Sequence, residues 1–426
     1  MNSQLTGTDQ RHLRRALELA EGGRGRVSPN PLVGAVLVRG GEVVGEGWHA
    51  ELGGPHAERA ALEDCRGRGE DPAGATMYVT LEPCAHTGRQ PPCAEAILEA
   101  GIARVVIASE DPSEKASGRG PGILRDGGVE VELAAGEEAT AARLLNQPFR
   151  KHARTGLPLV TLKLAMSLDG RTATPPGDSP WISGEASRAL VHRWRAESDA
   201  IAVGIETALA DDPLLTARPE PTEPASGAPY GPNGSIRRTG ARRTGAEVRQ
   251  PLRVVFDRWA RLPLDSRLLR TLEEAPVLVV VSSRAEAART AALRDAGAEV
   301  LVAEGVEAAL GDLGRRGVTS LFLEGGATLA AAFRAAGQLD EARVFVAPVL
   351  LGAGARRAGP LATAGGEPDR GPRAGGAGMG GVEGEPWPAP SAPPASGAGP
   401  ERLSALSRSV DSVGEDALIV ARFKEW

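Results

Sequence analysis

Apolar residues near the start of the chain come in short blocks whose spacing switches between helical and extended periods. Helical spacing predicts a helix that begins at a Thr8 cap and ends at residue 21. The apolar runs 33–39 and 42–48 are separated by two glycines, which indicates a hairpin with a two-residue turn. The following blocks predict a helix over 56–66, a strand over 76–80, a helix over 93–100 and a strand over 104–108. This alternation is typical of an α/β domain, which we expect to end near residue 150.

A second series of alternating strands and helices begins at residue 159. Its predicted strands cover 159–164, 200–203, 252–256, 277–281, 299–302, 320–323, 341–348 and 417–423. Its predicted helices cover 185–197, 285–295 and 327–336. Since 426 residues exceed the roughly 100–200 of a single domain, we expect two α/β domains, residues 1–150 and 151–426.

Two stretches of the second domain have the composition of insertions. Residues 219–250 contain five Pro and five Gly among 32 positions, and residues 365–400 contain eleven Gly and eight Pro among 36. Such segments bury too little apolar surface to offset their chain entropy, so we expect mobile surface insertions. The arginine pairs at 237–238 and 242–243 could form a nucleic-acid patch, but a solvated loop is the favoured interpretation.

Composition narrows the class of protein. The net charge of −6 disfavours a polyanion-binding protein, because affinity for phosphate backbones needs a surplus of basic side chains. No window approaches the ~18 uninterrupted apolar residues of a membrane span, and the N-terminus lacks the apolar stretch of a signal peptide, so we expect a cytoplasmic protein. Three cysteines, an odd number, do not make a disulfide framework.

Three residues with zinc-ligand chemistry lie at the starts of predicted helices or just after a strand. His56 opens helix 56–66, Cys84 follows strand 76–80, and Cys93 opens helix 93–100. One imidazole and two thiolates are good zinc ligands and leave a fourth position open for water. Helix N-termini favour the thiolate form of cysteine. Glu58, two residues after His56, is placed for proton transfer, so the set predicts a catalytic zinc site.

Each of these residues also has a simpler interpretation when it is taken alone. A lone histidine is usually a hydrogen-bonded helix residue, Glu58 could be a first-turn carboxylate, and Cys65 is an example of a merely packed cysteine. The combined pattern, His-x-Glu followed by Pro-Cys and a second Cys, is however the zinc deaminase signature. Its spacing departs from the generic form, because eight residues separate Cys84 from Cys93 instead of two.

The run 80–93, Thr-Leu-Glu-Pro-Cys-Ala-His-Thr-Gly-Arg-Gln-Pro-Pro-Cys, closely resembles the deaminase half of the bifunctional deaminase/reductase family of riboflavin biosynthesis, in which the wider spacing is the rule. The runs 29–34, 45–49 and 54–58 match the same family, and 111–112 and 118–120 fit it as substrate-side loops. The resemblance implies a cytidine-deaminase-like domain. The residues that it places at the site are the zinc ligands His56, Cys84 and Cys93, the proton shuttle Glu58, and Asn30 and His49 near the pyrimidine.

From residue 158 the chain resembles the reductase half of the same family, whose fold is similar to dihydrofolate reductase. The matching runs are 162–171, 179–183, 207–218 and 324–326. The resemblance implies contacts with NADPH from Ala165, Trp181, Thr207, Asp211 and the segment that begins at Gly326. It implies that the residues facing the substrate are Ser179, Arg195, Leu215, Arg218 and Glu324, with Lys163 near the reacting sugar. Arg195 and Arg218 suit a phosphate, because a guanidinium can bind phosphate oxygens in pairs.

Without this resemblance the second domain would not be identified as a reductase. Glu324-Gly325-Gly326 lies between a predicted strand and a predicted helix, where it could cradle a phosphate or simply form a tight turn. Lys163 would ordinarily be a solvated strand residue, Asp211 a turn residue and Trp181 a core residue.

The resemblance implies a bifunctional enzyme that acts on a phosphorylated pyrimidine with zinc and NADPH as cofactors, and we expect a homo-oligomer. The first activity would hydrolyse the 2-amino group of 2,5-diamino-6-ribosylamino-4(3H)-pyrimidinone 5′-phosphate, and the second would reduce the ribosyl group to ribityl. Two alternatives remain. A nucleic-acid-editing deaminase is disfavoured by 3% aromatic residues and the negative charge. A structural zinc module would need a fourth protein ligand, for which His86 is the nearby candidate.

Overall fold

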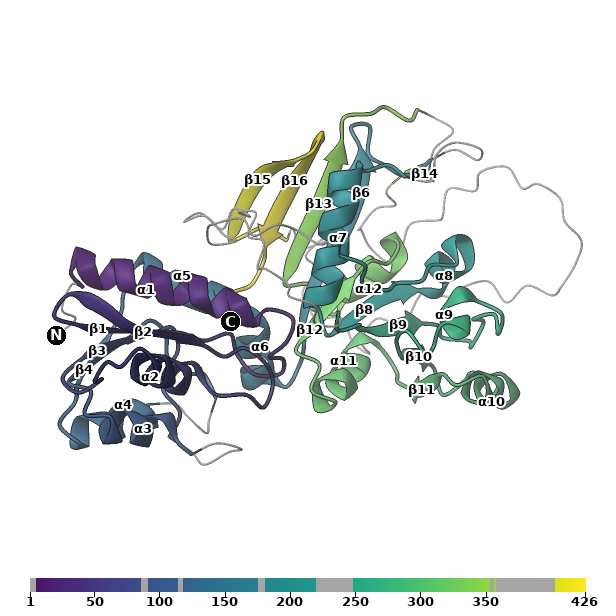
Figure 1. Cartoon of the computed structure of the whole chain (residues 1–426). Coiled ribbons are helices and arrows are strands. Elements are labelled where there is room, and N and C mark those ends of the chain that lie inside the picture. The colour runs from purple at the N-terminus through teal and green to yellow at the C-terminus, as the bar shows by residue number, and fades with distance from the viewer. Residues whose placement is uncertain are drawn as a thin grey trace, which may run out of the picture.

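The computed structural model describes residues 5–85, 91–113, 118–174, 181–219, 248–352, 356–357 and 403–426. The chain forms two α/β halves that lie side by side, with helix α6 between them (Figure 1). Most of the two predicted insertions, 219–250 and 365–400, lies outside the described residues. None of the described helices is long and apolar enough to cross a membrane.

The first half is a five-stranded sheet with helices on both faces. The strand order is β2-β1-β3-β4-β5, in which β1 runs antiparallel to β2 and β3 while β3, β4 and β5 are parallel. The strands are β1 (Gly34–Arg39), β2 (Glu42–Trp48), β3 (Thr76–Val79), β4 (Arg104–Ile107) and β5 (Glu130–Leu133). The helices are α1 (Gly7–Ala20), a 3-10 turn (Glu21–Gly23), α2 (Ala57–Gly67), α3 (Cys93–Glu99), α4 (Arg119–Asp126), α5 (Glu137–Leu145) and α6 (Gln147–Thr155).

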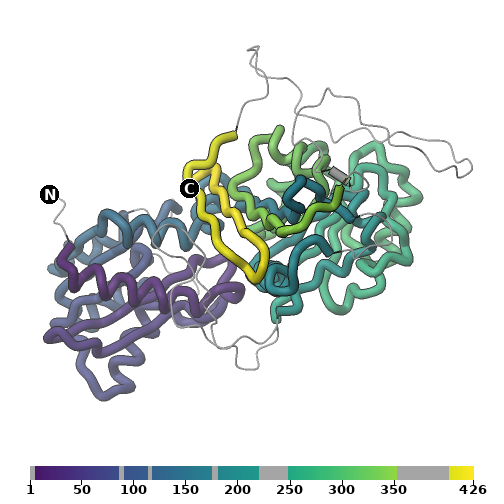
Figure 2. Tube along the Cα trace, turned by 90° about the horizontal axis from the view of Figure 1, so that it is seen from above, coloured from purple at the N-terminus to yellow at the C-terminus, as the bar shows by residue number. Residues whose placement is uncertain are grey.

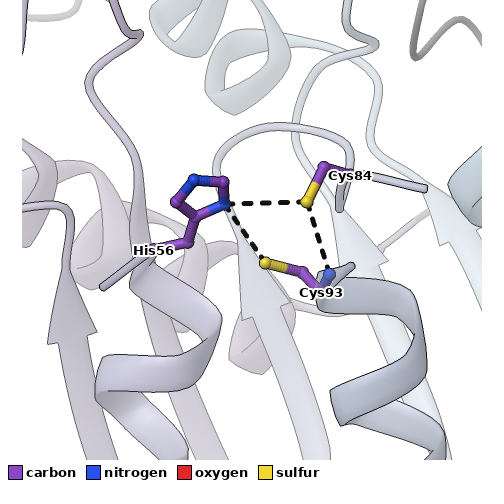
Figure 3. Close-up of side chains that lie close together, drawn as sticks. All are labelled: His56, Cys84 and Cys93. Carbon is purple, nitrogen blue, oxygen red and sulfur yellow. Dashed lines mark hydrogen bonds between the residues drawn. The ribbon is translucent and has the colours of Figure 1, made fainter. Parts of the chain in front are cut away.

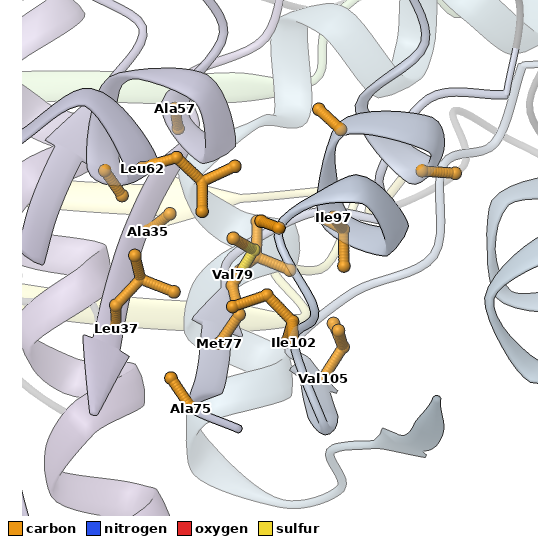
Figure 4. Close-up of a cluster of buried hydrophobic side chains, with 14 of the residues drawn as sticks. Ala35, Leu37, Ala57, Leu62, Ala75, Met77, Val79, Ile97, Ile102 and Val105 are labelled. Carbon is orange, nitrogen blue, oxygen red and sulfur yellow. The ribbon is translucent and has the colours of Figure 1, made fainter. Parts of the chain in front are cut away.

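Alternation along these strands sends apolar side chains to both faces of the sheet. Ala35, Leu37 and Val79 pack against the face covered by α2 and α3 (Figure 4). Val36 and Val106 point to the opposite face, which α1 and α5 cover. The predicted hairpin is present, and both of its turn glycines have positive φ, 60° and 89°, as a two-residue turn requires.

The second half is a nine-stranded sheet of order β11-β10-β9-β8-β12-β6-β13-β16-β15. Seven neighbouring strands are parallel, and the hairpin β15–β16 extends them antiparallel to β13 on the side that faces the first half (Figure 2). The strands of this sheet are β6 (Leu159–Ser167), β8 (Ala200–Gly204), β9 (Leu252–Phe256), β10 (Val277–Val281), β11 (Glu299–Val302), β12 (Ser320–Leu323), β13 (Glu341–Ala347), β15 (Ser407–Val413) and β16 (Asp416–Arg422). Two further strands, β7 (Arg171–Ala173) and β14 (Arg356–Arg357), pair with each other in a separate sheet. The helices are α7 (Glu185–Glu197), α8 (Ile205–Asp211), α9 (Arg267–Arg270), α10 (Ala287–Asp295), α11 (Val306–Arg315) and α12 (Ala327–Ala335).

Order in this sheet determines where a ligand can bind. The first strand along the chain, β6, lies two positions from β8, and β9, β10 and β11 follow β8 outward. Strand β12 then lies between β8 and β6, so the strand order reverses there. In open parallel sheets, ligands bind at the carboxyl ends of strands where the order reverses. The carboxyl ends of β6, β8 and β12 are therefore the expected place of the second site.

Buried polar contacts join the two halves through α6. The Lys151 ammonium of α6 lies 2.6 Å from Asp340 of the second half, and both side chains are almost completely buried. The Trp426 indole nitrogen donates to the other oxygen of Asp340 at 3.1 Å. Arg150 of α6 donates to the Trp426 carbonyl at 2.5 Å and to Glu110 of the first half at 2.8 Å. The boundary expected near residue 150 falls inside this connecting helix.

Every predicted helix and strand is present in the structure, in the predicted order, but one cap is wrong and several elements were not predicted. The elements that were not predicted are α4, α5, α6, α8, α9, α11, β5, β7, β14 and β15. Thr6, and not Thr8, caps α1, because Asp9 stands three residues after Thr6 and completes a reciprocal capping box. Thr8 lies inside the first turn.

Candidate functional site

The three predicted zinc ligands converge in the first half (Figure 3). His56 is the N-cap of α2, Cys93 is the first residue of α3, and Cys84 lies in the segment that follows β3. His56 Nδ1 is 3.6 Å from Cys84 Sγ and 3.3 Å from Cys93 Sγ. All three ligand atoms lie within 4.8 Å of one another, although 37 positions separate the outer two in sequence.

The chemistry of this cluster fits a zinc ion. One imidazole nitrogen and two sulfurs are the soft and borderline donors that zinc prefers, and three protein ligands are typical of a catalytic site. The backbone N–H of Cys93, at the start of α3, donates to Cys84 Sγ at 3.3 Å. Hydrogen bonding from Cys93 lowers the pKa of the Cys84 thiol, which favours the thiolate that a metal needs. Cys65 is a buried residue of α2 that belongs to the apolar core, and His86 lies outside the described residues.

Glu58 belongs to the first turn of α2, directly beside the cluster. Its side chain is 3% exposed and interacts with the Cys93 sulfur. Burial raises the pKa of the Glu58 carboxyl, and the negative charge of Cys84 raises it further. A carboxyl group whose pKa lies closer to neutrality both accepts and returns protons readily, which is what a proton shuttle requires.

Asn30 and His49 form a hydrogen-bonded pair next to the cluster. His49 Nδ1 lies 2.9 Å from the Pro55 carbonyl, which can only accept, so this nitrogen carries the proton. His49 Nε2 is then the acceptor for the Asn30 amide nitrogen at 3.1 Å. Burial lowers the pKa of His49 and keeps its ring neutral. The rings of His49 and His56 are 5.5 Å apart, so the pair holds the Asn30 amide beside the metal ligands.

Glu82 is a buried residue of this site to which the sequence assigned no role. Its backbone N–H donates to the Ser109 carbonyl at 2.9 Å, and its carboxylate accepts from the Asp111 N–H at 3.4 Å. Glu82 therefore ties the segment before Cys84 to the loop 109–113. Its signal in the sequence was its place inside the run 80–93, but the loop partner is nearly 30 residues away and has no local signature.

In the second half, the structure brings Thr207 and Gly326 together. Thr207 lies in the first turn of α8 and Gly326 is the N-cap of α12, and the preceding strands β8 and β12 are neighbours. The Gly326 N–H donates to Thr207 Oγ1 at 3.2 Å. A Cβ on Gly325 would lie 3.0 Å from the Leu329 side chain and 3.3 Å from the Gly204 nitrogen, so the close packing favours glycine there. Two helix N-termini thus converge at the expected ligand edge.

Arg195 and Glu324 form a bidentate pair at the same edge. Arg195 Nε and Nη2 lie 2.6 and 2.9 Å from the two carboxylate oxygens, and Nη1 donates to the Thr216 carbonyl at 3.2 Å. Burial would raise the pKa of Glu324, but the charge and hydrogen bonds of Arg195 outweigh it and lower that pKa. Burial lowers the pKa of Lys163, which interacts with Glu324. The Arg195 guanidinium, which was predicted to bind a phosphate, is thus paired with the Glu324 carboxylate in this structure.

The other predicted residues of the second site lie on nearby segments. Leu215 is buried and has a positive φ of 55°, and Arg218 is exposed and donates to Thr216 Oγ1 at 3.1 Å. Trp181 is 62% exposed, and the Arg188 guanidinium lies 5.2 Å from its ring centre, so it is not a core residue. The remaining members are Ala165 on β6, Asp211 at the end of α8, and Ser179, which lies outside the described residues.

Metal analysis tests the first cluster directly. We expect about one zinc ion per chain in the purified protein, and a loss of most of it in Cys84→Ser and Cys93→Ser, because a hydroxyl is a poor substitute for a thiolate ligand. Cys65→Ser, which changes a buried cysteine outside the cluster, is the matched control and should keep its zinc. Full occupancy in both ligand variants would contradict the assignment.

Two family models match the chain. One, described as "RibD C-terminal domain", matches residues 158–363, and the other, described as "Cytidine and deoxycytidylate deaminase zinc-binding region", matches residues 6–109. These matches confirm the predicted combination of a cytidine-deaminase-like domain with a reductase domain.

Relatives of known name cover both halves. "Riboflavin biosynthesis protein RibD" of Actinobacillus pleuropneumoniae is 40% identical over 82% of this chain and 86% of its own length. The protein of the same name from Escherichia coli is 39% identical over 82% of this chain and 90% of its own. The structure of Acinetobacter baumannii RibD superposes with a TM-score of 0.73, 35% identity and coverage of 98% of this chain and 99% of that chain. A Thermotoga maritima "diaminohydroxyphosphoribosylaminopyrimidine deaminase/5-amino-6-(5-phosphoribosylamino)uracil reductase" gives 0.73 and 31%, with the same coverage.

Proposed function

Because the chain belongs to the RibD family, the bifunctional deaminases and reductases of riboflavin biosynthesis, we propose a specific role for each of its two sites. The first half hydrolyses the 2-amino group of 2,5-diamino-6-ribosylamino-4(3H)-pyrimidinone 5′-phosphate. The second half reduces the ribosyl group of the deaminated product to ribityl with NADPH. The observation that carries the first role is the convergence of His56, Cys84, Cys93 and buried Glu58.

His56, Cys84 and Cys93 are proposed to hold the zinc ion of the deaminase. A zinc ion with three protein ligands supplies a Lewis acid that lowers the pKa of a bound water to about 7. Glu58 takes a proton from the attacking water and delivers it to the adjacent ring nitrogen of the pyrimidine. It then takes the second proton, from the hydroxyl group added at C2, and gives it to the amino group, which leaves as ammonia while the carbonyl forms. Asn30, held by His49, offers its amide to the polar edge of the ring.

Residues around the Arg195–Glu324 pair are proposed to orient the sugar in the second half. NADPH supplies the hydride that is added at C1′, while the ring oxygen takes a proton and becomes a hydroxyl. Lys163 is placed to give that proton, because burial lowers its pKa and makes its ammonium a better acid. Arg218, which is exposed, remains a candidate for the substrate phosphate, whereas Arg195 acts by positioning Glu324.

NADPH itself is proposed to lie across the two helix N-termini. Thr207 and Gly326 would face its phosphates, because these two hydrogen-bonded residues lie at the starts of α8 and α12 on the same edge of the sheet. Ala165, Trp181 and Asp211 would contact the rest of the cofactor, and Ser179 and Leu215 the substrate. We assign the deaminase to residues 1–150 and the reductase to 151–426, with α6 spanning the boundary.

We also propose that the protein works in the cytoplasm, where NADPH is available, as a homo-oligomer. The edge strand β15 supports the second point, because an exposed edge is a template for pairing with another chain. A monomeric mass in light scattering would contradict it.

Product masses with and without NADPH test the function. Incubation with the diamino substrate alone should replace one amino group by a carbonyl oxygen and stop there. Addition of NADPH should add two further hydrogens and oxidise an equivalent amount of cofactor. Deamination of an oligonucleotide but not of the free pyrimidine would support the nucleic-acid-editing alternative instead.

A further inference from the structure

A loop of the deaminase half that carries Asn30 packs against the reductase half. Gly25 in this loop has a positive φ of 74°, and a Cβ there would lie 2.9 Å from the Ala196 carbonyl at the end of α7. Three residues later, Ser28 Oγ donates to Asp199 Oδ2 at 2.8 Å, across a separation of 171 positions. The contact is therefore close in both backbone and side chain.

Asp199 is a rigid anchor of the reductase half. It is 4% exposed, and its Oδ2 accepts from the Thr319 N–H at 2.8 Å, from Thr319 Oγ1 at 2.7 Å and from the Ser320 N–H at 3.1 Å. Its Oδ1 pairs with Arg249 at 2.9 Å. Asp199 precedes β8 and Ser320 begins β12, so the anchor lies at the amino ends of these strands, opposite the edge where Thr207 and Glu324 lie.

The other end of the same loop is held just as closely. The Leu32 N–H and carbonyl both bond to the buried Asn146 side chain, each at 2.8 Å. Between these two attachments, the Asn30 N–H donates to the Val27 carbonyl at 2.9 Å and closes a turn. Asn30 is thus suspended between Ser28 and Leu32, with its amide directed to His49.

We propose that Ser28 and Asp199 form a positioning contact through which the reductase half fixes Asn30 for the substrate of the deaminase half. The inference rests on the proposed role of Asn30 as a substrate ligand. Neither Ser28 nor Asp199 is a catalytic residue; the contact reduces the conformational freedom that Asn30 would otherwise lose when substrate binds.

Steady-state kinetics of the full-length, zinc-loaded Ser28→Ala variant test the proposal. KM for deamination should rise about three- to ten-fold, because Asn30 loses one of the attachments that fix its position before substrate binds, while kcat stays nearly unchanged. Zinc content, melting temperature and reduction of the supplied deaminated intermediate should match the parent, because Asp199 keeps its other partners. Ser28→Thr, which retains the hydroxyl, should restore KM.

Two further variants separate this proposal from the one on which it rests. Arg249→Gln removes another partner of Asp199 on the reductase side and should leave the KM for deamination unchanged. Asn30→Ala should raise that KM by at least as much as Ser28→Ala.

If Asn30→Ala impairs deamination and Ser28→Ala does not, the interdomain contact has no positioning role. If neither variant changes KM, the proposed role of Asn30 is wrong. A parallel loss of melting temperature and of both activities in Ser28→Ala would show a purely structural contact and overturn the proposal.

Discussion

A Glu58→Gln variant is expected to lose at least about two orders of magnitude in deamination rate. Glutamine keeps the size of the side chain and most of its contacts, but it cannot accept the proton of the attacking water or return one to the leaving ammonia. Because Glu58 is only 3% exposed, bulk water has little access to the site and cannot readily take over the proton transfer. The measurement is the rate of formation of the deaminated product from the diamino substrate.

Three readouts show whether this loss is specific. Zinc content should remain at about one ion per chain, because the three ligand side chains are unchanged. NADPH oxidation with the supplied deaminated intermediate should proceed at the parental rate, since the reductase residues all follow position 158. Glu138→Gln is the matched control, because Glu138 is also a 3% exposed glutamate of the first half but pairs with Arg14. A deaminase that tolerates Glu58→Gln would disprove the proton-shuttle role.

The zinc cluster could be predicted because its residues are tied to local features of the chain. His56 and Cys93 stand at helix starts, which turn signals and apolar periodicity locate well. The resemblance then explained why the two cysteines are more widely spaced than in the generic deaminase signature. The hairpin over β1 and β2 was predictable for the same reason, since its two glycines permit the turn.

Contacts between distant segments have no comparable signal in the amino-acid sequence. The Arg195–Glu324 pair joins residues 129 positions apart. The resemblance could therefore place both residues at the substrate, but it could not show that their side chains pair with each other. Glu82 lies inside the run 80–93, but nothing local identifies its partners in the loop 109–113, and Ser28 and Asp199 belong to no motif. Strand β15 was missed because its exposed, mostly polar positions lack the apolar alternation of a half-buried strand.

In the reductase half, a Glu324→Gln variant is expected to lower kcat/KM for reduction of the deaminated intermediate by at least about 100-fold, a loss of roughly 2.7 kcal/mol in transition-state stabilisation. The carboxylate neutralises Arg195, whose side chain is 14% exposed, and it also interacts with the Lys163 ammonium. Without that negative charge, two cations face each other in a half-buried site, the pKa of Lys163 falls further, and less of the lysine carries the proton that the ring oxygen needs. Deamination should be unaffected, so the deaminated intermediate should accumulate in the presence of NADPH, and mass spectrometry of the reaction measures it.

The matched control is Glu341→Gln. Glu341 is also a buried glutamate of this sheet and is paired with Arg343 and Arg422, but it begins β13 at the amino end, away from the ligand edge. If both variants lost reduction equally and their melting temperatures fell together, the effect of Glu324 would be on folding. If only Glu324→Gln lost reduction and kept its melting temperature, the paired carboxylate would be required at the reductase site itself.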